Sequence, residues 1–172
     1  MTTGRGGRSA PTEGGAATGS GPQETGPHRL VLDHWITCAP YELLLHMQIV
    51  ETRDGRATLT MPFLLQFAQG AALMHGGALL SLADTAMVMA IKSVLEPHTH
   101  FATVHISADY LKPVSQGVVT ASARVTDWSG RKISGEARVS DDSDERVLFA
   151  TGRFVIARDA KIRNVTFSDQ DA

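Results

Sequence analysis

The strongest constraint on the fold is an apolar segment at residues 78–95, ALLSLADTAMVMAIKSVL. It is poor in Gly and Pro and apolar on nearly every face, which is typical of a buried helix. Asp84 is its only acidic residue, and Pro97 marks the expected end of the helix. The rest of the chain must therefore enclose this helix.

Segments with strand character lie on both sides of it. Residues 45–62, LHMQIVETRDGRATLTMP, predict two strands around Asp54-Gly55, because this dipeptide tolerates the positive φ of a tight hairpin turn. After the helix come four more segments: FATVHISADYLKP, GVVTASARVTDW, KISGEARVSD and RVLFATGRFVIA. Their separators are short and turn-like, so we expect consecutive strands to be antiparallel neighbours.

This order of elements limits the possible architectures. A single apolar helix beside one antiparallel sheet is buried only if the sheet curls around it. A hairpin, one buried helix and a four-stranded meander therefore predict an α+β hotdog fold, with an antiparallel sheet wrapped around one long central helix. The break at Pro40 predicts a short helix and a turn before the first strand.

Composition bounds the domain and its partners. Residues 28–160 are expected to form one domain, between a disordered tail at 1–27, rich in Gly, Thr, Ser and Pro, and a polar extension at 161–172. A net charge of -2 gives no argument for nucleic acid or an anionic membrane as partner. The lone Cys38 favours a reducing, cytoplasmic location, and no apolar stretch reaches the roughly 18 residues that suggest a membrane span.

Asp84 requires an explanation, because an unpaired carboxylate in such a helix costs several kcal/mol. A structural hydrogen bond or a solvent-facing position would account for it. A functional site would account for it equally well, since desolvated carboxylates are common at such sites.

The tripeptide His75-Gly76-Gly77 comes just before the helix. The first amides of a helix lack internal partners and lie at the positive end of its dipole, and glycines leave them open to a ligand. A thioester carbonyl that develops negative charge would find a donor there. For an isolated tripeptide, however, a tight turn with His75 as a cap or core residue is the favoured interpretation.

The spacing of Gly76 and Asp84 adds a condition. Eight residues along one helix correspond to about 12 Å and roughly 80° around the axis, so one carbonyl cannot touch both. If they cooperate, a second copy of the helix must bring Gly76 of one subunit near Asp84 of the other. If Gly76 and Asp84 act together on one substrate, the protein is therefore expected to form a dimer.

The pattern Gln69-x5-HGG-x4-SLADTA, followed by TVHISADYLKP, resembles the PaaI-like branch of the hotdog-fold acyl-CoA thioesterases over about residues 40 to 157. The resemblance implies hydrolysis of an acyl-CoA or aryl-CoA thioester, with no cofactor, by a homodimer or a dimer of dimers (a homotetramer). It implies that the Gly76 amide polarises the thioester carbonyl and that Asp84 activates water or attacks directly.

The resemblance also implies supporting roles. Gln69 would orient the nucleophile or water, and Thr103 would supply a hydroxyl. His75 and Gly77 complete the motif. Gln at the first position typically accompanies Glu on the helix in aryl-CoA thioesterases, whereas here it accompanies Asp84, so substrate class and mechanism stay open.

Further side chains are weaker candidates. Three basic residues at strand ends or turns are candidates for the phosphates of coenzyme A, although such residues are usually only solvated: Lys112, Arg131 and Lys132. His98, His100 and His105 invite a metal interpretation, but no acidic or cysteine partner accompanies them, and we expect no metal site. Two other functions remain open: a non-catalytic module that binds acyl ligands, and a hotdog hydratase or dehydratase.

Overall fold

The computed structural model describes residues 25–162 and 164–168. The elements in chain order are β1 (Leu30–Leu32), α1 (Pro40–Leu44), β2 (Gln48–Arg53), β3 (Arg56–Pro62), the 3-10 helix η1 (Leu65–Phe67), α2 (Gly76–Lys92), β4 (Thr99–Tyr110), β5 (Val118–Ser129), β6 (Lys132–Ser140), β7 (Arg146–Lys161) and β8 (Val165–Phe167).

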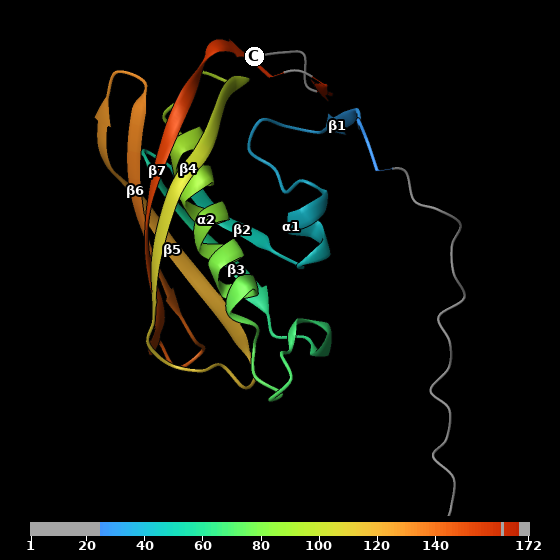
Figure 1. The fold of residues 1–172 in the computed structure, drawn as a ribbon, viewed down its shortest axis with the longest axis vertical. Helices are drawn as coiled ribbons and strands as arrows, with labels where there is room; N and C mark the ends of the chain where they lie inside the picture. Colours follow the sequence, from blue (N-terminus) through green and yellow to red (C-terminus); the bar gives the residue numbers. More distant parts are fainter. Residues whose placement is uncertain (1–24, 163, 169–172) are drawn as a thin grey trace, which may run out of the picture.

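Six of the strands form one antiparallel sheet, in the order β2-β3-β5-β6-β7-β4. The sheet curves around α2, and α1 lies on the other side of that helix (Figure 1). The predicted α+β hotdog fold is confirmed. The short helix near Pro40 is also present, although Pro40 begins it, as its fixed φ and missing N–H allow in a first turn.

The hairpin at Asp54-Gly55 is confirmed too. Both residues have positive φ, 49° and 72°, as a two-residue turn that follows the strand twist requires. The Gly55 amide donates to the Ser93 hydroxyl at 2.8 Å, which ties this turn to the end of α2.

The predicted four-stranded meander is wrong in one pairing. β4 pairs with β7, whereas β5 lies between β3 and β6, so β4 and β5 are not neighbours. The segment between them is a crossover rather than a turn, held by hydrogen bonds from Met74 N to Val114 O (2.8 Å) and from Phe63 N to Gly117 O (2.9 Å). As a result, β4 forms an edge of the sheet.

Helix α2 begins two residues before the predicted segment and ends three residues earlier. His75 is its N-cap, with Nδ1 accepting the Gly77 amide at 2.8 Å, so both glycines belong to the first turn of the helix. At the other end the Ser93 hydroxyl donates to the Ala90 carbonyl at 2.7 Å.

The helix is buried because the sheet has room for it. Met87, fully buried, packs against Gly135 and Gly152, which pair across β6 and β7. A Cβ on Gly152 would lie 3.1 Å from the Met87 methyl carbon, so the glycines form a notch that lets the helix approach.

Two short strands near the ends of the described chain were not predicted. β1 pairs in parallel with β8, and the buried Phe167 stacks on His98 with ring centroids 4.3 Å apart. Part of the predicted polar extension is thus a strand, while residues 1–24 of the predicted tail lie outside the described residues. Within the described part, no helix is long and apolar enough to cross a membrane.

Candidate active site

Asp84 lies half-buried in α2 with a hydrogen-bond partner on β4. The Thr103 hydroxyl donates to Asp84 Oδ1 at 3.1 Å. Burial raises the pKa of the Asp84 carboxyl above its ordinary value, the Thr103 hydrogen bond lowers it, and the negative charge of Glu42 on α1 raises it further. This carboxylate is therefore desolvated but oriented, as a general base or a nucleophile requires.

A bulge in β4 sets which side chains of this strand face α2. Thr103 pairs with Phe154 and His105 with Arg153, so Val104 is an extra residue opposite β7. One extra residue reverses the alternation of side chains. Thr103 and Tyr110 are seven residues apart and would point to opposite faces of a regular strand, yet both bond to α2.

Tyr110 contacts the start of the helix. Its hydroxyl donates to the Gly76 carbonyl at 3.1 Å, while the amide of the same peptide unit, Gly77 N–H, donates to His75 Nδ1 at 2.8 Å. Among the described residues the Gly76 amide has no acceptor. One peptide group is thus held from both sides, and the preceding amide is left open to a ligand at the positive end of the helix.

Gln69 lies in the loop before this turn. Its amide oxygen accepts the Ala71 amide at 2.5 Å, and an isolated bridge between Ala68 and Met74 closes the loop. His75 N–H donates to Phe67 O at 2.8 Å, so the loop leads directly into the cap of α2. Among the described residues, Gln69 and Asp84 form no hydrogen bond with each other, so in one protomer Gln69 supports the loop.

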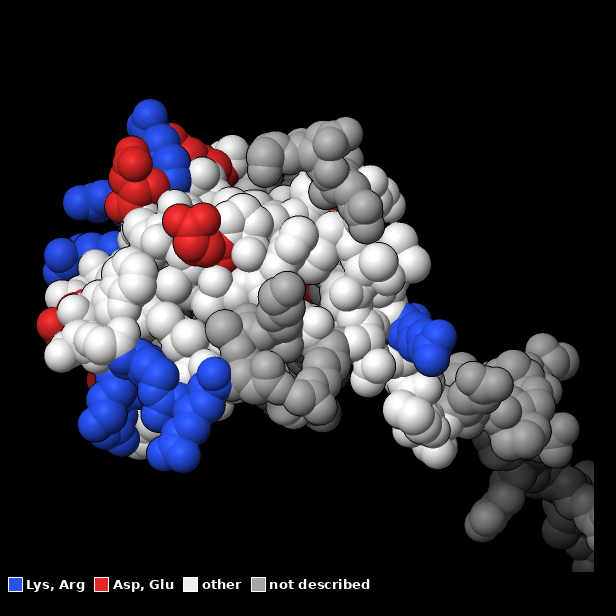
Figure 2. Space-filling view, turned by 90° about the horizontal axis from the view of Figure 1, so that it is seen from above, with Lys and Arg blue, Asp and Glu red and all other residues white. Residues whose placement is uncertain are grey.

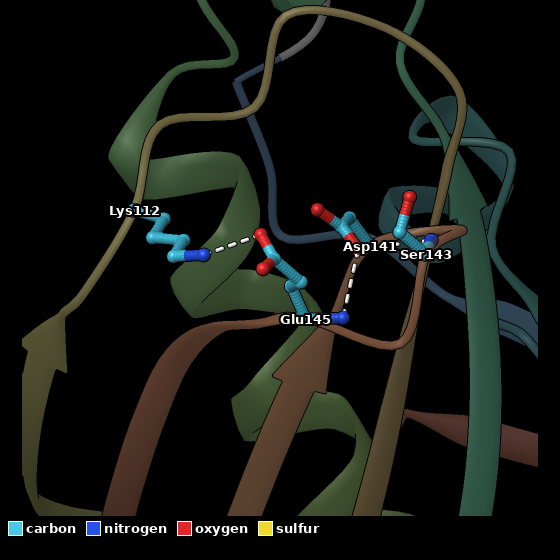
Figure 3. Close-up of polar contacts among 4 residues, drawn as sticks. All are labelled: Lys112, Asp141, Ser143 and Glu145. Atoms are coloured by element: carbon cyan, nitrogen blue, oxygen red, sulfur yellow. Dashed lines mark hydrogen bonds and ion pairs between the residues drawn. The ribbon is translucent and has the colours of Figure 1, made fainter.

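The three basic candidates do not come together in one protomer. Lys112 forms an ion pair with Glu145 in the turn between β6 and β7 (Figure 3). Arg131 donates to the Ile156 carbonyl at 3.0 Å, and Lys132 pairs with Val155.

These contacts lie at distant points of β7. The Lys112 amide donates to Val147 O, whereas Lys132 lies opposite Val155, eight residues further along. That is about 26 Å at ~3.3 Å per residue. Seen from above, most of the Lys and Arg side chains lie along one margin of the molecule, with acidic side chains among them, and another basic group lies on the opposite side (Figure 2). Lys112, Arg131 and Lys132 therefore cannot all bind the same phosphate group within one protomer.

The histidines give no metal site in the described residues, where no group of three or more His, Cys, Asp or Glu side chains is placed to hold an ion. His98 instead stacks on Phe167 and contacts Trp35 edge to face, so its ring is part of a small aromatic cluster.

Sequence reasoning missed two residues at the site. Tyr110 lies inside the quoted TVHISADYLKP segment, but its contact with Gly76 depends on the bulge. Glu42 acts on Asp84 from α1, which is 42 residues earlier in the chain, and no local pattern signals that proximity.

A curved antiparallel sheet around one helix, with polar groups at the helix start and in its middle, defines a hotdog-fold protein. Residues 72–148 match the model of the thioesterase superfamily. The candidate esterase ComA2 of Bacillus subtilis (strain 168) is 36% identical over 108 residues, which cover 62% of this chain and 85% of that protein. The chain belongs to the thioesterase superfamily.

Solved structures agree. The conserved protein PA5202 from Pseudomonas aeruginosa is 28% identical, with a TM-score of 0.68, covering 72% of this chain and 97% of that one. The PaaI protein of the E. coli phenylacetic acid degradation operon has the same fold, with a TM-score of 0.66 at 24% identity, covering 74% of this chain and 88% of that one.

Proposed function

We propose that this protein hydrolyses an acyl-CoA or aryl-CoA thioester to the free carboxylic acid and coenzyme A. The observation that carries the proposal is the pair of groups on α2: a desolvated carboxylate held by Thr103, and the open Gly76 amide at the helix start. Membership in the thioesterase superfamily supports this chemistry in general, and the coenzyme A ester is our choice of substrate.

Each group has a defined part in the reaction. In the general-base route Asp84 takes a proton from water, whose oxygen attacks the thioester carbon while Gly76 N–H stabilises the oxyanion. The C–S bond then breaks and the thiolate of coenzyme A takes up a proton. In the alternative route Asp84 attacks directly, expels the thiolate and forms an anhydride, which water hydrolyses.

The site requires two subunits. Within one α2 the two groups are about 12 Å apart along the axis. β4 is an edge strand of 12 residues, and Val104 on it is 60% exposed, which favours pairing of two β4 strands in a dimer. Such a dimer would bring Gly76 of one subunit toward Asp84 of the other.

The test is hydrolysis of a panel of acyl-CoA and aryl-CoA esters, followed by detection of released thiol. We expect turnover by the wild type and at least a ~100-fold lower rate for Asp84→Asn. Binding of esters without turnover would favour a non-catalytic module. Addition of water to an enoyl-CoA would favour a hydratase. A single turnover in ¹⁸O-labelled water tests the direct route, because label enters the Asp84 carboxyl only when water opens an anhydride at the Asp84 carbonyl carbon.

A further inference from the structure

A cleft of about 200 Å³ opens beside the Asp84–Thr103 pair, between α2 and the first half of β4. Its lining includes Val88 and Lys92 of α2 and Thr103 of β4. Trp35, Phe101 and Ile162 supply most of the apolar remainder. An acyl group whose carbonyl carbon faced Asp84 could extend past Thr103 into this cleft.

The cleft follows one strip of the helix. Asp84, Val88 and Lys92 recur every four residues, so Val88 adjoins both of the others along α2. Lys92 is about 12 Å from Asp84 along the axis, and its side chain leans back toward the start of the helix. Lys92 and Thr103 both line the cleft, and the Thr103 hydroxyl donates to Asp84, so the cleft leads from the ammonium group toward the carboxylate.

Lys92 is an unusual residue for an apolar wall. It is half-buried, and burial lowers the pKa of its ammonium group, with the charges of Glu42 and Cys38 acting in the opposite direction. Its Nζ donates to the Trp35 carbonyl at 2.9 Å and lies 4.7 Å from the centre of the Trp35 ring. No carboxylate of a described residue forms an ion pair with it.

Part of this arrangement is structural. Trp35 Nε1 donates to the Lys92 carbonyl at 3.1 Å, so the two residues clasp the segment before α1 to the end of α2, where a cation also suits the helix dipole. That clasp uses one ammonium hydrogen. The other two form no hydrogen bond in the described chain, so the ammonium group keeps donor capacity for a ligand besides its contact with the Trp35 ring.

We propose that the cleft binds the acyl group of the substrate and that Lys92 selects acyl groups that end in a carboxylate. The inference rests on the proposed thioester hydrolysis and adds the substrate class: ω-carboxyacyl thioesters rather than simple fatty acyl thioesters. Aromatic and aliphatic walls hold the carbon chain, and the ammonium group pairs with the distal carboxylate in a setting that water screens poorly.

The experiment compares matched pairs of coenzyme A esters with equal carbon number. The pairs are succinyl with butyryl, glutaryl with pentanoyl, adipyl with hexanoyl and suberyl with octanoyl. We expect the wild type to favour the carboxylated member by about tenfold in kcat/KM at one or two of these lengths. A preference of unity or below at every length would overturn the proposal.

Variants of Lys92 separate specificity from structure. Lys92→Met keeps most of the side-chain length and loses the charge, so the preference for the carboxylated ester should disappear or reverse. Lys92→Arg keeps the positive charge and should still favour the carboxylated ester. The ratio within a pair is the readout because a general effect on folding changes both members alike. An unchanged ratio in Lys92→Met would contradict the role. Arg138→Met removes an exposed charge from the outer face of β6 and should leave the ratio as in the wild type, which controls for long-range attraction.

Binding makes the test independent of turnover. Titration calorimetry of Asp84→Asn with adipyl-CoA and hexanoyl-CoA should show the same preference in Kd, and Lys92→Met in the same background should remove it. If no ester is hydrolysed but this difference in Kd is found, the proposed function fails while the binding preference stands. If turnover is found without the difference in Kd or kcat/KM, the preference fails and hydrolysis stands.

Discussion

The hydroxyl of Tyr110 donates a hydrogen bond to the carbonyl oxygen of Gly76 at 3.1 Å. This bond joins the end of the edge strand β4 to the first turn of α2. It fixes the peptide group that follows the open Gly76 amide, on which stabilisation of the oxyanion depends. Tyr110 is therefore a positioning residue for the amide.

Tyr110→Phe removes this bond and keeps the ring. We expect kcat to fall by about fivefold, which corresponds to ~1 kcal/mol for a neutral hydrogen bond, while KM changes less. Steady-state kinetics on the best substrate measures both constants. A fall confined to KM, with kcat as in the wild type, would show that Tyr110 acts on binding instead.

Gly76→Ala should act through the same contact. A Cβ at this position would lie 3.0 Å from Tyr110 Cε1, so the exposed ring has to shift by a few tenths of an ångström, which strains its hydrogen bond to the Gly76 carbonyl. We expect a loss of kcat similar to that of Tyr110→Phe and a double variant clearly less impaired than the product of the single effects. A double-mutant cycle on kcat measures this coupling, and independent effects would refute it.

Much of this fold follows from local sequence signals, and the site follows only in part. The Asp54-Gly55 turn and the apolar helix are visible because turn chemistry and helical periodicity are local. The position of β4 next to β7 is not, since it depends on the path of the crossover at residues 111–117. The bulge at Val104 leaves no mark in the alternation of side chains, so the joint orientation of Thr103 and Tyr110 toward α2 was beyond sequence reasoning.

Thr103→Val removes a hydrogen bond that lowers the pKa of Asp84. If Asp84 acts as its carboxylate, the rate falls on the acid side as this group is protonated, and the variant moves that limb to higher pH. Thr103→Ser keeps the hydroxyl and should retain the wild-type limb. The pH dependence of kcat/KM for both variants is the measurement, and identical limbs for Val and Ser would exclude this role.

Glu42→Gln should shift the same limb in the opposite direction. The charge of Glu42 raises the pKa of Asp84, so its removal favours the ionised form and extends activity to lower pH. The Gln side-chain oxygen can still accept the Ala39 amide that Glu42 caps at 3.0 Å, so α1 should persist. A limb that moves to higher pH, or an unchanged limb with α1 intact, would contradict the prediction.

Asp84→Asn should stabilise the fold at neutral pH. Because burial raises the pKa of Asp84 in the folded state, the stability that goes with its protonated form is complete below the unfolded-state pKa and is lost as pH rises through the raised value. Asn does not titrate and avoids that loss. We expect the Tm of the variant to exceed that of the wild type by about 2 °C near neutral pH and to match it in acid, as followed by calorimetry. A difference that is the same at both pH values would show that ionisation is not the cause.

Val104→Asp should weaken the dimer that the proposed site requires. Val104 is 60% exposed at the bulge of the edge strand β4, and a charge there opposes strand pairing between subunits. Sedimentation should show a shift toward monomer, and kcat/KM should become dependent on protein concentration, since each site draws on two subunits. Leu65→Asp is the matched control: Leu65 is 89% exposed in η1, away from that edge, and its substitution should change neither property. A monomeric Val104→Asp protein with full, concentration-independent activity would mean that Gly76 and Asp84 do not act across a subunit interface.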